Sequence, residues 1–154
     1  MKPDLSSPFY ISHVRSLCFS YQHWTGKQLI EGHEKIDNIA EVLFNAPFAL
    51  VSHGTETIPV FNFGNNTALE LFELDWDKFI QLPSQESADQ DNQEDRKKLM
   101  ARVNKNGYEE NCKGIRISST GKRFLIEGAT VWNIINEQDQ YFGQAAMFTW
   151  WKFL

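Results

Sequence analysis

The sequence predicts an α+β domain built around a five-stranded antiparallel sheet, with short helices on one face and a helical extension at the N-terminus. Three observations carry this prediction. Residues 46–72 have the pattern of two short strands followed at once by a helix. Residues 113–150 have the pattern of three more strands separated by turns. The 154 residues, 42% of them hydrophobic and 14% aromatic, are enough to bury one core.

The first predicted element is a helix in an N-terminal extension, residues 1–34, ahead of a main unit at residues 35–154. Ser7 followed by Pro8 is a helix-start signal, because the hydroxyl caps free amides and proline needs no N–H in the first turn. Apolar side chains then recur at steps of three and four along one helix face. This stripe consists of Tyr10, Val14, Leu17, Tyr21 and Trp24. It either packs against the domain or forms the seam of a homodimer.

Short helices and the first two strands are predicted between this extension and the middle of the chain. Pro47 ends the first of these helices, since proline disfavours helical backbone at the residue before it. An asparagine after the second strand can cap the next helix. The predicted order is helix 37–44, strands 48–52 and 60–63, a helix that begins at Asn65 or Asn66, and a helical segment over 74–82.

A polar segment and a longer helix are predicted next. Residues 84–90 contain a single apolar side chain, Ala88, so we expect an exposed and mobile loop. Asp91 with Glu94 three residues later resembles a capping box and predicts the start of an amphipathic helix. Gly107 can adopt the left-handed conformation that ends it.

The last third of the chain predicts a three-stranded meander. Strands at residues 113–118 and 122–132 flank the turn at residues 119–121, whose glycine allows positive φ. Gly128 interrupts the second strand and indicates a β-bulge. A third strand follows at residues 141–150.

Composition argues against several classes of protein. The net charge of -5 opposes a nucleic-acid surface, which requires clustered Lys and Arg. No segment has the ~18 consecutive apolar residues of a membrane span, and the N-terminus has no apolar signal core. Cys18 and Cys112 stand far apart with no metal-binding spacing, which favours reduced thiols. We therefore expect a cytoplasmic protein that binds neither nucleic acid nor membrane.

The order of these elements resembles the PAS fold, and short segments of the sequence support the resemblance. Residues 61–72, FNFGNNTALELF, resemble the PAS segment in which a strand ends at Asn and a helix with buried Ala and Leu follows. Residues 118–124, SSTGKRF, resemble the PAS hairpin. Further segments are similar to the MEKHLA domain family, which is related to PAS. They are APFALVSHGT at 46–55, ALELFELDW at 68–76, LPS at 82–84, NGY at 106–108 and ATVWN at 129–133.

The MEKHLA resemblance implies a fold and a general role. The family occurs as stand-alone bacterial proteins, the type this chain resembles, and at the C-terminus of certain plant homeodomain transcription factors. Resemblance implies a PAS-like sheet, a regulatory role in protein interaction in plants, and no catalytic residues. We therefore expect a sensory or protein-interaction module that signals through an unknown protein partner, or through a homodimer formed by the N-terminal helix.

The PAS resemblance also implies a cavity between the sheet and the short helices. Such a cavity could hold an apolar or aromatic small molecule, although cavity lining and packed core look alike in sequence. The predicted apolar lining is Phe48, Leu50, Phe61, Phe63, Leu69, Phe72, Trp76, Phe79, Ile117, Trp132 and Phe148. The predicted polar groups are His53, Arg116 and Asn133. Gly128, Gly143, Ala145 and Ala146 would leave room near the sheet.

His53 has three interpretations. It either holds a turn, binds a ligand as a pH-responsive group, or acts with Glu56 as the acid–base pair of a small enzyme. No GxSxG or HExxH pattern supports catalysis, and the histidines are too widely spaced to share a metal on one helical turn.

Two cofactors found in PAS-type sensors do not match this sequence. Asn111-Cys112-Lys113 superficially resembles the flavin-binding photosensory motif, but here it enters a predicted strand and not a helix. Haem-binding sensors commonly take a histidine from the long helix, and residues 92–106 contain none. The sequence thus argues against both flavin and haem, and it leaves the identity of any ligand open.

Overall fold

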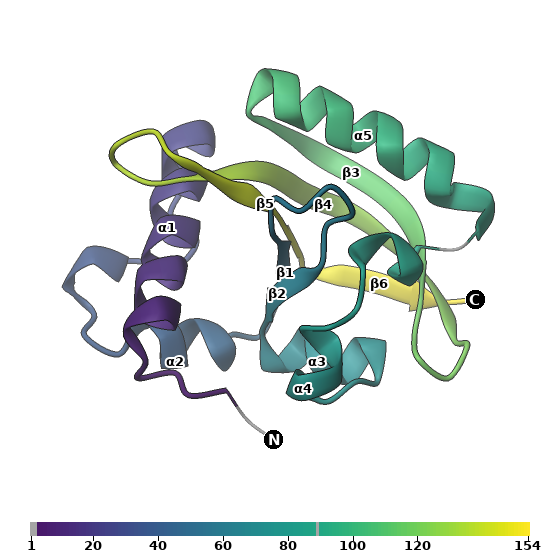
Figure 1. Ribbon diagram of the computed structural model, residues 1–154, viewed down its shortest axis with the longest axis horizontal. Helices are drawn as coiled ribbons and strands as arrows, with labels where there is room; N and C mark the ends of the chain where they lie inside the picture. Colours follow the sequence, from purple (N-terminus) through teal and green to yellow (C-terminus); the bar gives the residue numbers. More distant parts are fainter. Residues whose placement is uncertain (1–2, 89) are drawn as a thin grey trace.

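A six-stranded antiparallel sheet forms the centre of the computed structural model, which describes residues 3–88 and 90–154 (Figure 1). Five strands follow the spatial order β2-β1-β5-β4-β3, and β6 pairs with the first half of β4. The strands are Ala49–His53 (β1), Phe61–Gly64 (β2), Tyr108–Ile117 (β3), Arg123–Ile135 (β4), Tyr141–Phe148 (β5) and Trp150–Phe153 (β6). The predicted α+β class with an antiparallel sheet is confirmed.

Helices cover both faces of this sheet. In Figure 1, α1 and α2 lie on one side of it, and α3, α4 and α5 lie on the other. The helices are Pro8–Thr25 (α1), Ile39–Phe44 (α2), Asn66–Phe72 (α3), Trp76–Phe79 (α4) and Gln93–Asn106 (α5). Single 3-10 turns occur at His33–Lys35 (η1), Ser84–Ser87 (η2) and Gln90–Asn92 (η3). We call the side covered by α1 the outer face and the side covered by α5 the inner face.

The helix α1 begins where the sequence predicts, and Gly26 ends it. Ser7 Oγ accepts a hydrogen bond from the Tyr10 N–H at 3.3 Å, and Gly26 at φ 75° donates its N–H to the Gln22 carbonyl. Its apolar stripe packs against β4, where the Tyr21 ring lies 5.0 Å from the Trp132 ring, centroid to centroid. The stripe is therefore used for packing within the subunit, one of the two roles that the sequence left open.

Asn65 joins three elements at one corner of the sheet. Its Oδ1 accepts the N–H of Ala68 at the start of α3 and the N–H of Leu50 in β1. Its Nδ2 donates to the Phe48 carbonyl at 2.7 Å and to the Leu43 carbonyl at 3.3 Å. This fully buried side chain thus fixes α2, β1 and α3 relative to one another.

Two β-bulges on opposite strands shape the β3–β4 hairpin. Between the pairs Cys112↔Ala129 and Gly114↔Ile126, β4 has one residue more than β3, and Gly128 lies there at φ 70°. Between Glu109↔Val131 and Cys112↔Ala129, β3 has the extra residue. The bulge predicted at Gly128 is confirmed, and the second bulge restores the side-chain alternation that the first one shifts.

The polar segment after α4 differs from its prediction as an exposed loop. Ser84, Ser87 and Ala88 are buried, while Asp89 lies outside the described residues. Ala88 forms a bridge with Arg116 of β3, and the Ser84 N–H donates to the Pro59 carbonyl. The expectation of exposure is wrong because backbone pairing holds a polar segment against the sheet without a run of apolar side chains.

Several boundaries also differ from their predictions. The strand β3 begins at Tyr108, before the predicted start at residue 113. The helix α5 begins at Gln93 with Asn92 at its N-cap, so the capping position predicted at Asp91 is wrong. The last predicted strand divides at Thr149 into β5 and β6, and β6 adds a sixth strand by pairing with β4. None of the helices within residues 3–88 and 90–154 is long and apolar enough to cross a membrane.

Candidate functional site: a cavity between α5 and the sheet

A cavity of about 90 Å³ lies between α5, η2 and the inner face of the sheet. Its walls are mostly apolar, with aromatic side chains from β2, α3 and β5 and small residues from β4 and β5. The polar and thiol side chains at its wall include His53, Ser84, Ser87, Arg96, Cys112, Arg116 and Gln144.

Some of the predicted pocket residues meet at this cavity and others do not. Those at its wall are His53, Phe61, Phe72, Arg116 and Phe148. Of the small residues predicted to leave room there, Ala145 and Ala146 line it, whereas Gly128 and Gly143 do not. Those that the structure places away from it are Phe48, Leu50, Phe63, Leu69, Trp76, Phe79, Ile117, Trp132 and Asn133.

The register of the strands explains this division. Trp132 contacts α1 on the outer face, where its Nε1 donates to Ser20 Oγ at 3.0 Å. A register shift in the β1–β2 pair leaves Phe61 opposite His53 at the cavity and Phe63 opposite Ser52, whose hydroxyl meets His13 of α1. Asn133 lies on the inner face but binds α5, because its Nδ2 donates to the Val103 carbonyl.

Two arginines bring positive charge to the cavity from different elements. Arg96 comes from α5 and donates to Ser84 Oγ, and Arg116 comes from β3 and donates to the Ile115 carbonyl at 3.0 Å. Burial, together with the neighbouring charge of Arg116, lowers the pKa of Arg96 to about 10. Burial also lowers the pKa of Arg116. Both guanidinium groups stay charged at neutral pH.

His53 is a neutral imidazole at this site. Burial lowers its pKa to about 4, while its Nδ1 lies 3.1 Å from the Gly54 carbonyl oxygen. A proton on Nδ1 would satisfy that carbonyl and leave Nε2 as an acceptor. No hydrogen bond or ion pair joins the described side chains of His53 and Glu56, and Glu56 Oε1 accepts the Val60 N–H at 3.2 Å. The geometry therefore gives no acid–base pair between these two side chains.

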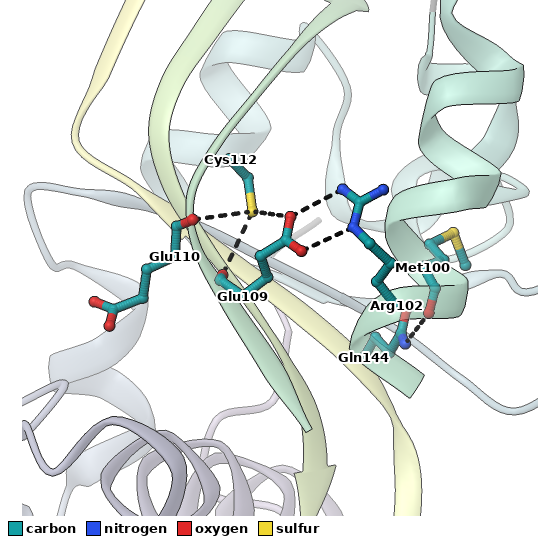
Figure 2. Close-up of polar contacts among 6 residues, drawn as sticks. All are labelled: Met100, Arg102, Glu109, Glu110, Cys112 and Gln144. Carbon is teal, nitrogen blue, oxygen red and sulfur yellow. Dashed lines mark hydrogen bonds and ion pairs between the residues drawn. The ribbon is translucent and has the colours of Figure 1, made fainter. Parts of the chain in front are cut away.

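Gln144 and Arg96 line the cavity but are missing from the set predicted from sequence. Gln144 is the more informative of the two. Its side-chain Nε2 donates to the Met100 carbonyl of α5 at 3.1 Å, a contact visible in Figure 2, and to Asn133 Oδ1 at 3.1 Å. In the described parts of the chain, its Oε1 is the buried side-chain oxygen that has no hydrogen-bond partner. The available signal was an amide inside an otherwise apolar strand, next to Ala145 and Ala146.

Cys112 is at the cavity wall but is not activated. Its thiol donates to the Glu109 carbonyl at 3.4 Å, while the Glu109 carboxylate forms a two-point ion pair with Arg102 (Figure 2). Burial raises the pKa of Cys112 to about 11, so the thiol stays protonated at neutral pH.

The residues present do not fit a flavin or a haem. The cavity of about 90 Å³ is well below the ~300 Å³ at which pockets for drug-sized ligands begin. Cys112 lies on strand β3, with its thiol engaged by backbone carbonyls. Within the described residues, no group of three or more His, Cys, Asp or Glu side chains could hold a metal ion.

With this site defined, comparison with known proteins decides the family. The MEKHLA domain matches this sequence over residues 11–153. The chain belongs to the MEKHLA domain family. The family resemblance predicted from short segments is confirmed across nearly the whole chain.

Curated relatives of this MEKHLA domain include plant proteins. Homeobox-leucine zipper protein ATHB-14 of Arabidopsis thaliana is 26% identical over 153 residues, which cover 97% of this chain and 18% of the relative. Homeobox-leucine zipper protein HOX32 of Oryza sativa subsp. indica is 21% identical, over 88% of this chain and 16% of the relative. The chain thus spans less than a fifth of the length of these relatives.

Solved structures confirm the PAS-like fold of the MEKHLA domain. The PAS domain of a protein from Colwellia psychrerythraea aligns with TM-score 0.61 and 15% identity, covering 75% of this chain and 92% of that one. An RNA-binding light-oxygen-voltage receptor aligns with TM-score 0.59 and 11% identity, covering 78% of this chain and 33% of that one. At these identities the likeness establishes the fold alone.

Proposed function

We propose that this MEKHLA domain is a PAS-like sensory or protein-interaction module whose inner-face cavity binds a small molecule. The observation that carries this proposal is the combination of two cavity-facing arginines with the unpartnered Gln144 oxygen at one wall. Buried polar groups are normally hydrogen-bonded, and a group left unpaired in an otherwise packed core indicates a binding role.

A ligand at this site would contact both the sheet and α5. Arg116 and Gln144 come from strands, whereas Arg96, Leu99 and Met100 come from α5. Because Gln144 also bonds the Met100 carbonyl, a ligand that engages its free oxygen would be linked to α5 through this side chain, and one that pulls the amide toward the cavity would change how α5 is held. The resulting shift of α5 would alter the surface offered to a protein partner.

Three further parts of the sequence prediction stay proposals. We propose a cytoplasmic location, because Cys18 and Cys112 are free thiols. We keep residues 35–154 as the PAS-like unit, with residues 1–34 as the extension that covers its outer face. A homodimer through α1 would have to use the exposed side of that helix, which carries Phe9, since the apolar stripe is packed inward.

Native mass spectrometry tests the proposed function directly. The protein is purified from its own host under gentle conditions, beside an Arg116→Leu variant of the same chain. We expect a small noncovalent adduct on the wild-type protein that is lost from the variant. A clean apo mass for the wild-type protein, together with no response to candidate ligands, would contradict the small-molecule role.

A further inference from the structure

The positive charges of Arg96 and Arg116 at the cavity favour an anionic ligand. A guanidinium group has five N–H donors. Within residues 3–88 and 90–154, Arg96 makes one side-chain hydrogen bond, to Ser84 Oγ, and Arg116 makes one, to the Ile115 carbonyl. The ion pairs between described side chains involve Lys27, Arg102 and Lys122, and neither cavity arginine takes part in them. Two neighbouring guanidinium groups disfavour each other, and a carboxylate between them would satisfy both.

The side chain of Gln144 favours a ligand that also carries a hydrogen-bond donor. Gln144 Oε1 is a buried acceptor without a described partner, and leaving such a group unpaired is costly. His53 stands directly opposite Gln144 in the β1–β5 pair, and its neutral ring offers a second acceptor. An ammonium donor would add a further positive charge beside Arg96 and Arg116. A hydroxyl group supplies the donor without that repulsion.

The size of the cavity limits the rest of the ligand. A volume of about 90 Å³ corresponds to ~3 water molecules and is smaller than the ~150 Å³ apolar cavity that accepts benzene. An acid with roughly four to six heavy atoms fits this range. A groove of about 580 Å³ between α5 and β3 shares Arg96, Cys112 and Arg116 with the cavity and provides a route of entry.

We infer that the cavity binds a short-chain hydroxy-carboxylate, with its carboxylate between Arg96 and Arg116 and its hydroxyl donating to Gln144 Oε1. This inference rests on the proposed function, because it specifies the ligand of the same cavity. It replaces the apolar or aromatic ligand expected from sequence with a smaller and charged one.

Titration calorimetry of the full chain with four probes tests the inference. Glycolate and lactate carry both features, propionate lacks the hydroxyl, and alanine replaces it with an ammonium. We expect glycolate or lactate to bind at least about tenfold more tightly than propionate, since an unmet buried acceptor penalises a ligand without the donor. Alanine should show the weakest binding. Equal affinity for all four probes would overturn the inference.

Substitutions test which residues contact the carboxylate and the hydroxyl of the ligand. Arg116→Leu should abolish binding, and Gln144→Leu should reduce the preference for glycolate over propionate to less than about threefold while propionate still binds. Lys97→Leu is the matched control, because Lys97 is an exposed cation on α5 that lines neither the cavity nor the groove. Loss of binding in Lys97→Leu equal to that in Arg116→Leu would contradict the assignment.

Two further variants address misfolding of Arg116→Leu and a competing carboxylate from the chain itself. If Arg116→Leu does not fold, Gly114→Ala serves instead, since a Cβ there would lie 2.8 Å from Arg116 Nη1 and displace the guanidinium.

Asp89 follows Ala88, the partner of Arg116, but lies outside the described residues. We expect Asp89→Asn to change glycolate affinity less than about threefold. An increase above about tenfold would identify Asp89 as the natural counter-anion and overturn the inference.

The two proposals fail in distinguishable ways. A retained molecule that is not a hydroxy-carboxylate would overturn this inference and leave the proposed function standing. An apo mass combined with no heat from any probe would overturn both.

Discussion

The two faces of the sheet differ in whether their buried polar groups have hydrogen-bond partners. On the outer face, two buried polar groups of the sheet meet partners from α1: Trp132 Nε1 bonds Ser20 Oγ, and Ser52 Oγ lies 2.9 Å from His13 Nε2. On the inner face, α5 leaves a cavity with two arginines and an unpaired Gln144 oxygen. A completed hydrogen-bond network stabilises a fold, whereas an incomplete one at a cavity costs stability and offers binding contacts. The outer face thus maintains the fold and the inner face is available for a ligand.

The largest effect should come from removing the outer cover. Deletion of residues 1–34 takes away Val14, Leu17 and Tyr21, which are buried against the rest of the core. At ~1.5–3 kcal/mol for each buried side chain, we expect a loss of roughly 5 kcal/mol in the free energy of unfolding. Urea denaturation of the two chains measures it. An unchanged midpoint would show that the extension adds nothing to the stability of residues 35–154.

A single substitution on the outer face should give the next largest effect. Trp132 is fully buried, so Trp132→Ala should lower the free energy of unfolding by ~3–5 kcal/mol. The residue does not line the cavity, so probe binding to the folded fraction should not change. Denaturation followed by calorimetry separates the two quantities. A loss of binding without a loss of stability would contradict the division between the faces.

The pH dependence of stability compares one histidine from each face. Burial lowers the pKa of His13 on the outer face and of His53 on the inner face to about 4. Each ring therefore binds a proton more readily in the unfolded chain, and stability should fall as the pH drops from 6.5 toward 4. The expected loss at pH 4 is about 3 kcal/mol for each ring, because lowering a pKa from 6.5 to about 4 is worth ~1.4 kcal/mol per pH unit.

His13→Asn and His53→Asn should each flatten this dependence by about half. Urea midpoints at several pH values between 4 and 7 measure it for both variants and the wild-type protein. If one variant removed the whole dependence, the other histidine would not be buried as the structure shows.

The smallest expected changes in stability come from one polar substitution on each face. Ser20→Ala removes the outer-face partner of Trp132 and should cost ~1–2 kcal/mol of stability. Arg116→Leu removes a desolvated charge from the inner face and should change stability by less than ~1 kcal/mol, or increase it. Thermal denaturation compares the two variants. A larger loss for Arg116→Leu would mean that its charge has a structural partner.

The sequence determined the local features of this protein, together with its fold class and family. Ser7 begins α1 and Gly26 ends it, because capping depends on residues within one turn. Gly128 permits a β-bulge that needs positive φ. Short segments of sequence also indicated the MEKHLA family, which the match over residues 11–153 confirms.

Only the tertiary structure decided which side chains meet at the cavity. Leu50 and Trp132 were predicted there but do not line it, because the strand register turns them toward the other face, and a shift of one residue reverses every side chain that follows. Arg96 and Gln144 are 48 positions apart in the chain. Their meeting at one wall depends on how α5 packs over the sheet, which no local pattern encodes.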